Sequence, residues 1–259
     1  MLDEMDPHAA RAALEWLVEM GCDEAIGDHP VNRFALVERA APPAAPPPLS
    51  QAPGDAPAPV DPVTEAETMA ARAGTLEELR AALDAYPHCD LRRGAKSLVF
   101  SDGNPAARVM IIGEAPGREE DRAGRPFVGQ AGQLLDRMLA AIGLARDHAD
   151  PSRAVYITNI LPWRPPSNRD PAPDEVAMML PFLRRHVELA NPDLLVLTGN
   201  HACNAVLGQR GITRLRGSWT DGFGRPALPL LHPAYLLRQP QAKRDTWADL
   251  LDLAARLEG

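Results

Sequence analysis

Short apolar runs alternate with amphipathic segments along the chain from about residue 105 onward. The apolar runs have the length of buried strands, and they are found at residues 108–112, 154–158, 194–198 and 227–231. The amphipathic segments carry apolar residues at helical spacing, and they are found at residues 133–144, 174–190, 199–207 and 243–257. Buried strands that alternate with helices favour a parallel, doubly wound sheet. The expected fold is α/β, with three α/β/α layers around a mainly parallel four-stranded sheet.

The fourth of these strands contains Pro229, which has no backbone N–H to donate to a neighbouring strand. Proline inside a sheet is largely confined to edge strands and bulges. The strand at 227–231 is therefore predicted to lie at an edge of the sheet. The sequence shows no internal repeat.

The first sixty residues differ in composition from the rest of the chain. Residues 6–20 begin with Asp6 as an N-cap and Pro7 in the first helical turn, which predicts a short helix. Nine of the 27 prolines fall between Pro42 and Pro62, a pattern typical of an extended linker. We expect three parts, namely an acidic helical segment at 1–40, a Pro/Ala-rich linker at 41–62 and a globular domain at 63–259.

Predicted helices lie on both sides of the linker. Residues 75–86 predict another helix near the start of the globular domain. The N-terminal helix has an apolar face and a long tether, so docking to a protein partner and packing on its own domain are equally consistent with it.

Composition narrows the class of protein. Hydrophobic residues make up 45% of the chain and charged residues 24%, which is typical of a globular protein with a core. No apolar run approaches the roughly 18 residues of a membrane span, and the acidic start does not resemble a signal peptide. Three widely spaced cysteines exclude a disulfide scaffold. A cytoplasmic, monomeric protein without membrane association is expected.

The formal net charge of −8 is unevenly distributed. Residues 1–89 carry five Arg and no Lys against sixteen acidic residues, a net charge of −11. Residues 90–259 carry 22 basic and 19 acidic residues, a net charge of +3. A nucleic-acid ligand is therefore compatible with the C-terminal part, although arginine serves salt bridges as well as phosphate contacts.

Polar and glycine-rich clusters follow each predicted strand directly. Ligands of open α/β sheets bind at the carboxyl ends of the strands, so these clusters mark the candidate site. They are residues 113–117, Asn159 with the loop to Arg169, Gly199 with Asn200, and His232 with Pro233. A single cluster of this kind is often only a strand-to-helix turn, but four at one rim of the sheet indicate a site.

The loop at residues 113–129 carries most of the chemistry. It holds four acidic residues within eight positions, and carboxylates there are suited to position or deprotonate water. Its glycines allow a ligand to approach the backbone closely. Phe127 offers an aromatic face to a planar ligand, although a phenylalanine is more often simply buried.

These residues resemble the family 4 uracil-DNA glycosylases. The resemblance covers about residues 89–257, and several long motifs carry it in the same order along the chain. The motifs are Gly113-Glu-Ala-Pro-Gly117 with Glu120-Asp121, Gly124-Arg-Pro-Phe-Val-Gly129, Thr158-Asn159 with Arg164-Pro165-Pro166 and Asn168-Arg169, and His232-Pro233 with Leu237-Arg238. The resemblance implies the uracil-DNA glycosylase fold and the hydrolysis of the N-glycosidic bond of a flipped-out deoxyuridine in DNA. The products would be free uracil and an abasic site.

The resemblance also implies a uracil pocket. In it, Phe127 stacks on the base and Asn159 presents its carboxamide to the N3–H and O4 edge, because one carboxamide offers a donor and an acceptor. Gly113 and Ala115 complete the pocket. His232 donates a hydrogen bond to O2 as the leaving group becomes anionic.

Glu120 and Glu114 are the catalytic carboxylates that the resemblance implies. Glu120 is favoured for holding the attacking water, with Glu114 also in the site, but the sequence alone does not separate their roles. Each of them is also compatible with merely capping the turn that follows it.

The expected DNA contacts come from four segments. Leu237 is predicted to fill the space vacated by the base, and Arg238 to contact a phosphate. Asn200 either cradles a phosphate at a helix start or merely begins the helix. Arg164 and Arg169 fit phosphate contacts and internal salt bridges equally well.

One departure from the family pattern concerns a cofactor. Family 4 enzymes typically hold a [4Fe–4S] cluster with four cysteines. Here Cys89 stands at the second of these positions, while Tyr86, Trp163 and Met179 stand at the other three. One thiolate cannot hold a cluster that needs four ligands. We therefore expect no cluster and no other metal or cofactor.

Three functions are compatible with these residues. The favoured one is a monofunctional, metal-independent uracil-DNA glycosylase of base-excision repair. The first alternative is a catalytically weak or silent module that binds uracil or DNA, and the second is a small-molecule hydrolase on a similar sheet. A related subgroup captures uracil covalently through a histidine in a basic insertion, and residues 163–171 contain neither, so ordinary turnover is expected. The preference for single- or double-stranded DNA and activity on hypoxanthine or xanthine stay open.

Overall fold

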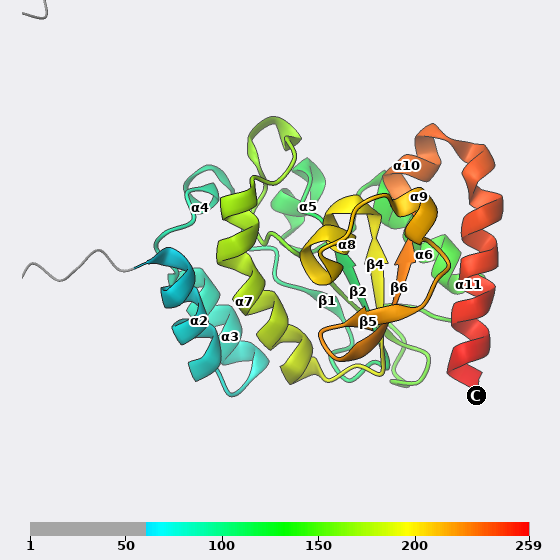
Figure 1. Ribbon diagram of the computed structural model, residues 1–259, viewed down its shortest axis with the longest axis horizontal. Coiled ribbons are helices and arrows are strands. Elements are labelled where there is room, and N and C mark those ends of the chain that lie inside the picture. The colour runs from blue at the N-terminus through cyan, green and yellow to red at the C-terminus, as the bar shows by residue number, and fades with distance from the viewer. Residues whose placement is uncertain (1–60, 259) are drawn as a thin grey trace, which may run out of the picture. The chain divides into compact units, whose positions relative to one another are not determined.

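The computed structural model describes residues 61–258, which form one folded unit (Figure 1). The segment at 1–40 with its predicted helix, and nearly all of the predicted linker, lie outside these residues. Helix α2 (Pro62–Arg72) was not predicted; the Asp61 carboxylate caps it by accepting the Thr64 N–H, and Pro62 fits its first turn. Helix α3 (Leu76–Ala85) confirms the helix predicted at 75–86.

A six-stranded sheet in the order β1-β3-β2-β4-β6-β5 forms the centre of the domain. The four central strands are parallel and confirm the predicted ones; they are β2 (Val109–Gly113), β3 (Val155–Asn159), β4 (Leu194–Thr198) and β6 (Arg225–Leu230). Two antiparallel edge strands, β1 (Asp102–Gly103) and β5 (Thr220–Gly222), were not predicted. They are too short to produce a hydrophobic pattern.

The edge position predicted for the strand that contains Pro229 is wrong. That strand, β6, lies between β4 and β5. The pairing with β5 ends at Ala227, two residues before the proline, and beyond it the Pro229 carbonyl accepts a hydrogen bond from the Gly217 N–H. Because the antiparallel ladder does not reach Pro229, the missing N–H is tolerated in an interior strand.

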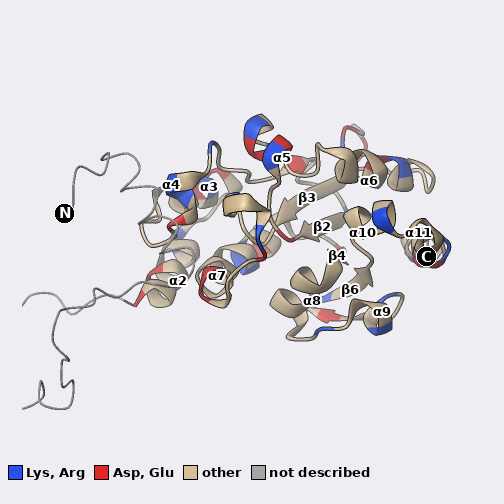
Figure 2. Ribbon diagram, turned by 90° about the horizontal axis from the view of Figure 1, so that it is seen from above, with Lys and Arg blue, Asp and Glu red and all other residues tan. Residues whose placement is uncertain are grey.

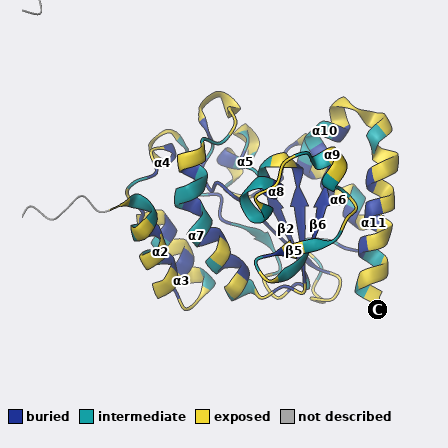
Figure 3. Cartoon of the chain, in the orientation of Figure 1, coloured by how far each residue is buried: buried dark blue, intermediate teal, exposed yellow. Residues whose placement is uncertain are grey.

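Helices cover both faces of the sheet, as Figures 1 and 2 show. Alternate strand residues point to opposite faces, so Met110 and Ile112 join one hydrophobic cluster and Val109 and Ile111 join the other. The first cluster includes residues of α2, α3, α7 (Pro173–Ala190) and α8 (Gly199–Leu207); the second includes residues of α6 (Gln130–Ala140) and α11 (Lys243–Glu258). Figure 3 shows the buried strands between helices that are exposed on their outer sides. The predicted three-layer fold is confirmed.

The remaining helices are short, and several lie near the carboxyl ends of the parallel strands. They are α4 (Leu91–Gly94), α5 (Arg118–Ala123), η2 (Pro166–Asn168), α9 (Ile212–Leu215), α10 (Pro233–Arg238) and η3 (Pro240–Ala242). Helix α6 begins three residues earlier than the predicted 133–144, directly after Gly129, and ends four residues earlier, before Gly143 with its positive φ of 77°. None of the helices between residues 61 and 258 combines the length and apolar character needed to cross a membrane.

Candidate active site

A cavity of about 200 Å³ opens where β2 and β3 end. The predicted site residues in its wall are Glu114, Ala115, Glu120, Phe127, Asn159, Arg169 and His232. Drug-sized ligands occupy pockets of roughly 300–1,000 Å³, so this cavity suits a single small ring. The loops after three different strands contribute to it, as the position of the rim in a parallel sheet predicts.

Gly113 shapes the cavity by lacking a side chain. It ends β2 and is in register with Asn159, which ends β3. A Cβ at Gly113 would lie 2.3 Å from the Asn159 Oδ1 and 2.5 Å from the Phe127 ring. The glycine therefore allows the carboxamide and the aromatic ring to approach the same point from two sides.

Phe127 has a backbone conformation that residues other than glycine rarely adopt. Its φ is +53°, in the left-handed region, and its side chain is buried. The ring centroid lies 5.7 Å from that of His232, with the two planes tilted by 30°. The first turn of α6 packs against the Phe127 backbone so closely that a Cβ at Gly132 would meet its carbonyl oxygen. Strained backbone of this kind is concentrated at ligand sites.

The Asn159 carboxamide lines the cavity although the residue is only 6% exposed. Within residues 61–258 its side chain makes no hydrogen bond, and neither of its polar atoms is sealed away from solvent. A ligand that displaces solvent from the cavity has to bond this amide, because an amide buried without a partner is unfavourable by roughly 1–3 kcal/mol. The Asn159 side chain is therefore a polar group that a ligand in the cavity can satisfy.

His232 is held as a neutral hydrogen-bond donor. It caps α10, and its Nδ1 accepts the Ala234 N–H at 3.1 Å. In a neutral imidazole the nitrogen that accepts cannot carry the proton, so Nε2 carries it. The pKa of His232 is lowered to about 4, mainly by desolvation and also by the nearby Arg238 and His201. The ring is thus uncharged at neutral pH, with Nε2–H as its donor.

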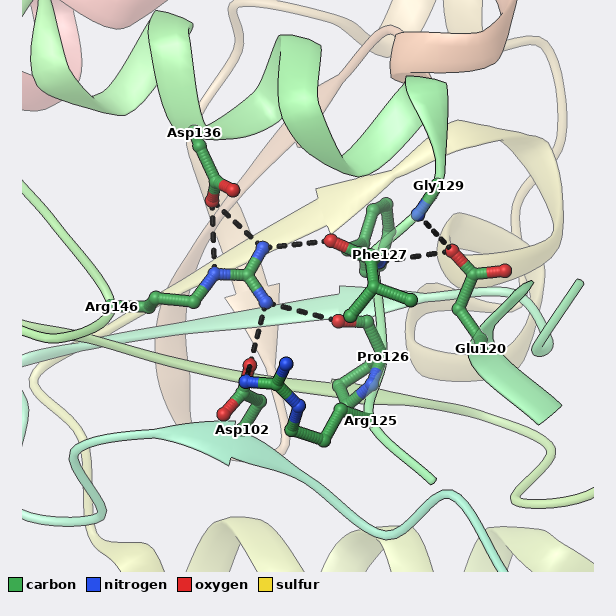
Figure 4. Close-up of polar contacts among 9 residues, drawn as sticks. Asp102, Glu120, Arg125, Pro126, Phe127, Gly129, Asp136 and Arg146 are labelled. Atoms are coloured by element: carbon green, nitrogen blue, oxygen red, sulfur yellow. Dashed lines mark hydrogen bonds and ion pairs between the residues drawn. The ribbon is translucent and has the colours of Figure 1, made fainter. Parts of the chain in front are cut away.

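The two predicted catalytic carboxylates differ in their surroundings. Both oxygens of Glu120 accept backbone hydrogen bonds. Oε1 accepts from the N–H groups of Val128 and Gly129 at 3.0 and 2.8 Å (Figure 4), and Oε2 accepts from that of Gly117 at 3.1 Å. Gly117 and Gly129 are the residues that immediately precede α5 and α6. Glu120 therefore joins the starts of two helices and fixes the loop between them.

Glu114 keeps its carboxylate available. Its side chain is 32% exposed and makes no hydrogen bond within the part of the chain that the structure describes. Desolvation raises the pKa of Glu114; His201, whose Nε2 lies 3.9 Å from Oε2, lowers it, and Asp170 raises it. Sequence reasoning missed His201 and Asp170, because neither belongs to a spacing pattern.

Glu114, Asp170 and His201 are also the group of described residues whose ligand atoms come close enough to hold a metal ion, all within 4.8 Å of one another. Asp170 is exposed. Exposed charged groups often gather in this way without binding a metal. In this arrangement the His201 imidazole lowers the pKa of Glu114 and the Asp170 carboxylate raises it.

A second cavity of about 620 Å³ adjoins the first and shares Glu114 and His232 with it. Arg238, at the end of α10, lines this second cavity, and so does Asn200. Leu237 is 40% exposed on the same helix. The structure thus places Arg238 and Asn200 in a cavity that adjoins the small one, and Leu237 on the exposed side of the helix that carries Arg238.

Three of the predicted DNA contacts have partners within the protein. The Arg169 guanidinium bonds both oxygens of Glu175, at 2.9 and 2.5 Å. The Arg164 Nε donates to Asn168 Oδ1 at 2.7 Å. The Asn200 Oδ1 accepts the N–H groups that precede and begin α9, at 3.0 and 2.8 Å. The salt-bridge interpretation is therefore met for Arg169, and the phosphate contacts stay predictions.

Tyr86, Cys89, Trp163 and Met179 stand at the four positions of the iron–sulfur ligands in family 4 enzymes, and all of them lie in the first hydrophobic cluster. We call these four residues the packed cluster. All four side chains are 0–2% exposed. The Tyr86 hydroxyl donates to the Pro62 carbonyl at 2.7 Å, and burial raises the pKa of the Cys89 thiol to about 11. One protonated thiol among large apolar side chains does not fit a cluster that needs four thiolates.

The sequence profile of the uracil DNA glycosylase superfamily matches residues 100–251. The type-4 uracil-DNA glycosylase of Thermotoga maritima is 40% identical over 153 residues, which cover 58% of this chain and 77% of that protein. The type-4 uracil-DNA glycosylase of Archaeoglobus fulgidus is 39% identical over 170 residues, which cover 62% of this chain and 82% of that protein. The type-4 uracil-DNA glycosylase of Sulfurisphaera tokodaii is 36% identical over 180 residues, which cover 66% of this chain and 79% of that protein. The chain belongs to the uracil DNA glycosylase superfamily and, within it, to the type-4 family.

Proposed function

We propose that the chain hydrolyses the N-glycosidic bond of deoxyuridine in DNA, which releases uracil and leaves an abasic site. The observation that carries this proposal is the convergence of an aromatic ring, an unpartnered carboxamide and a neutral imidazole donor on one small cavity. The names of the type-4 relatives support the same substrate. The bond is out of reach in a stacked helix, so the nucleotide must be flipped into the cavity.

Uracil recognition follows from the groups that the cavity offers. The ring of Phe127 stacks on the base, and the Asn159 carboxamide accepts from N3–H and donates to O4. Gly113 and Ala115 leave the space that the planar ring needs. Cytosine presents the reverse donor and acceptor pattern at this edge, so it leaves the buried carboxamide unsatisfied unless the amide turns over.

In the chemical step the C1′–N1 bond breaks, and uracil leaves with the electron pair. His232 donates its Nε2–H to O2, where negative charge develops, an oxyanion-type stabilisation of roughly 3 kcal/mol. A neutral imidazole is a very weak acid, so it stabilises the charge through a hydrogen bond and keeps its own proton, and uracil leaves as an anion. The water oxygen then bonds to C1′, and its proton passes to a carboxylate.

Glu114 is the carboxylate that we assign to the water. Its oxygens have no hydrogen-bond partner among residues 61–258, whereas those of Glu120 already accept three backbone N–H groups. The resemblance favours Glu120 for this role; the contacts favour Glu120 as the residue that maintains the loop. Both carboxylates also place negative charge near the sugar, which becomes cationic as the bond breaks.

The reaction in this proposal uses side chains alone, without an iron–sulfur cluster. The support is the chemistry of the packed cluster, in which tyrosine, tryptophan and methionine stand at three of the four ligand positions. Iron and acid-labile sulfide would be measured on protein purified without oxygen. Four iron atoms per chain, together with the matching visible absorption, would overturn this part of the proposal.

The test of the main proposal is uracil release from a uracil-containing oligonucleotide, followed by alkaline cleavage at the abasic site. Wild-type protein should give strand scission in the presence of a chelator. Glu114→Gln should lower kcat by about 10²–10⁴, the usual contribution of a general base, while the protein stays folded. Glu120→Gln should lower the melting temperature as well as the rate, because it removes a charged acceptor of backbone hydrogen bonds.

The outcomes separate the alternatives. Binding of the oligonucleotide by wild-type protein without release of uracil would indicate the silent binding module. Release of uracil from free deoxyuridine but not from DNA would indicate a small-molecule hydrolase. If Glu114→Gln kept full activity while Glu120→Gln was fully stable but inactive, the attacking water would be assigned to Glu120.

The DNA path is proposed along the second cavity. Arg238 would meet a phosphate and the exposed Leu237 would enter the space that the flipped base leaves.

The N-terminal segment is proposed to serve a protein partner or the domain itself. Deletion of residues 1–60 with measurement of uracil release tests whether it contributes to catalysis.

A further inference from the structure

Arg146 lies outside the cavity but uses its entire hydrogen-bonding capacity next to it. It follows α6, and its side chain is 14% exposed. Nη1 donates to the Asp102 carboxylate and the Pro126 carbonyl at 2.7 and 3.0 Å, and Nη2 to the Phe127 carbonyl and the Asp136 carboxylate at 2.9 and 2.7 Å. Nε also donates to Asp136, at 2.9 Å. A guanidinium has five N–H donors, and all five are engaged.

Two carboxylates from different elements hold this guanidinium in place. Asp102 belongs to β1 and Asp136 to α6. Desolvation lowers the pKa of Arg146, but the hydrogen bonds to both carboxylates outweigh it and raise the pKa, so the group stays charged. Arg125 also faces Asp102, at 3.8 Å, but its side chain is 61% exposed. Because Arg146 is fixed from two sides, it presents its remaining donors in one direction, toward the loop that contains Phe127.

The loop from Pro126 to Gly129 lies between a cation and an anion, as Figure 4 shows. Its first two carbonyls accept from Arg146, and its last two N–H groups donate to Glu120. The positive guanidinium therefore faces carbonyl oxygens, and the negative carboxylate faces N–H groups. The residue between these contacts is Phe127, whose φ of +53° is rarely adopted by a side chain of this size.

We infer that Arg146, fixed by Asp102 and Asp136, is a positioning residue that keeps Phe127 in the orientation needed to stack on the base. The inference rests on the proposed function and adds to it a residue that touches neither base nor DNA. Without Arg146, the two carbonyls lose their common donor, and the loop is free to relax to the negative φ that phenylalanine prefers. The ring then leaves its place beside His232.

The test uses the full-length chain with Arg146 replaced by Ala. A displacement of about 1 Å in a positioning group can lower activity about 10²-fold, so kcat/KM for uracil release should fall by about that factor. Guanidinium ion at low millimolar concentration should restore part of the lost activity, since it can occupy the vacated site. Arg146→Lys should give an intermediate loss, because an ammonium has three donors instead of five.

Arg108→Ala is the matched control. Arg108 also bonds a carboxylate and a backbone carbonyl, those of Asp193 and Leu257 at 2.6 and 2.9 Å, but it immediately precedes β2, at the amino ends of the parallel strands. Its removal should change kcat/KM by less than about twofold, as for a substitution far from the site. An equal loss in both variants would mean that Arg146 acts only through general stability.

A double-mutant cycle shows whether Arg146 acts through Phe127. In a Phe127→Ala background, Arg146→Ala should change kcat/KM little further, because the ring that it positions is gone. Losses that multiply would overturn the inference. One readout does not depend on activity: a nuclear Overhauser effect between the rings of Phe127 and His232 should be present in the wild type, weaken in Arg146→Ala and persist in Arg108→Ala. Wild-type protein that releases no uracil but shows this pattern would refute the proposed function and leave the positioning intact.

Discussion

The cavity and the packed cluster are neighbours along the chain, since Asn159 lines the first and Trp163 belongs to the second. In the cavity, the Asn159 carboxamide and the Glu114 carboxylate have no hydrogen-bond partner among residues 61–258, and Phe127 has a strained backbone. In the packed cluster, large apolar side chains are fully buried, and the Tyr86 hydroxyl is hydrogen-bonded. One region keeps polar groups ready for a ligand, and the other stabilises the fold.

On the proposed function, stability and activity depend on different residues of the same domain. Unpaired polar groups and strained backbone reduce stability and persist at sites where function needs them. Buried apolar side chains contribute to stability through transfer from water and close packing. Substitutions in the two regions should have opposite signatures, with activity lost in the cavity and stability lost in the packed cluster.

The largest effect is expected for Trp163→Ala. Its side chain is 2% exposed, and truncation of a buried aromatic residue lowers the free energy of unfolding by about 3–5 kcal/mol. Urea denaturation followed by circular dichroism measures this loss. The kcat for uracil release, measured at a temperature where the variant is folded, should stay within about twofold of the wild type because the cavity is unchanged.

Trp247→Ala is the matched control, since that tryptophan is 42% exposed on α11. Its free energy of unfolding should change by no more than about 0.5 kcal/mol, as for most surface substitutions. If Trp163→Ala abolished uracil release at full stability, the packed cluster would have a part in catalysis, and the contrast between the regions would fail.

Asn159→Ala should give the reverse signature. A site built to hydrogen-bond its substrate loses about 10²–10³ in kcat/KM when that group is removed. The free energy of unfolding should be nearly unchanged, because the Asn159 side chain makes no hydrogen bond within residues 61–258. Steady-state kinetics and urea denaturation on the same preparation measure both quantities. Similar losses of stability for Asn159→Ala and Trp163→Ala would show that Asn159 is a packing residue.

The sequence predicted the parts of the fold that have a regular pattern. The four central strands and their flanking helices follow from apolar runs and helical spacing, and the rim follows from parallel topology. The short strands β1 and β5 carry too few residues for a pattern, and α2 was hidden behind a proline-rich stretch. Pro229 misled because the edge rule assumes that a neighbouring ladder extends along the whole strand.

The wall of the cavity could be predicted from motifs, but its electrostatics could not. The sequence alone does not separate the roles of Glu114 and Glu120, because the backbone N–H groups that bond to Glu120 come together only when the loop is folded. Arg146 and His201 belong to no motif, and the partners that give them a role lie far away in sequence. A local pattern cannot report contacts that the fold alone creates.

The pH dependence of the reaction tests the electrostatic side of the contrast. Desolvation raises the pKa of Glu114, so its carboxylate becomes protonated at a higher pH than an ordinary glutamate as the pH falls. The kcat/KM for uracil release should decline on the acid side as this group is protonated. His232, with a pKa of about 4, should stay neutral through that decline.

Two neighbours of Glu114 should move the acid limb in opposite directions. His201 lowers the pKa of Glu114, so His201→Asn should shift the limb to higher pH; Asp170 raises it, so Asp170→Asn should shift the limb to lower pH. Rate measurements between pH 4 and 8 with a constant-ionic-strength buffer test both signs. A limb that does not respond to either substitution would mean that another group carries the proton.

The smallest effect is expected for two arginines near the cavity, one of which faces an open space while the other is bonded within the protein. Arg238 lines the second cavity, whereas Arg169 is bonded to both oxygens of the largely buried Glu175. Each phosphate contact contributes about 0.9 to the slope of log affinity against log salt concentration for duplex DNA. Arg238→Ala should therefore reduce that slope by about 0.9 and weaken binding a few-fold at physiological salt.

Arg169→Ala should leave the slope unchanged and lower the free energy of unfolding, because Glu175 loses the cation that lowers its pKa. Titration of a labelled uracil-containing duplex with each arginine variant in the Glu114→Gln background, which should release uracil slowly, measures both slopes. A reduced slope for Arg169→Ala would mean that its guanidinium exchanges Glu175 for a phosphate when DNA binds.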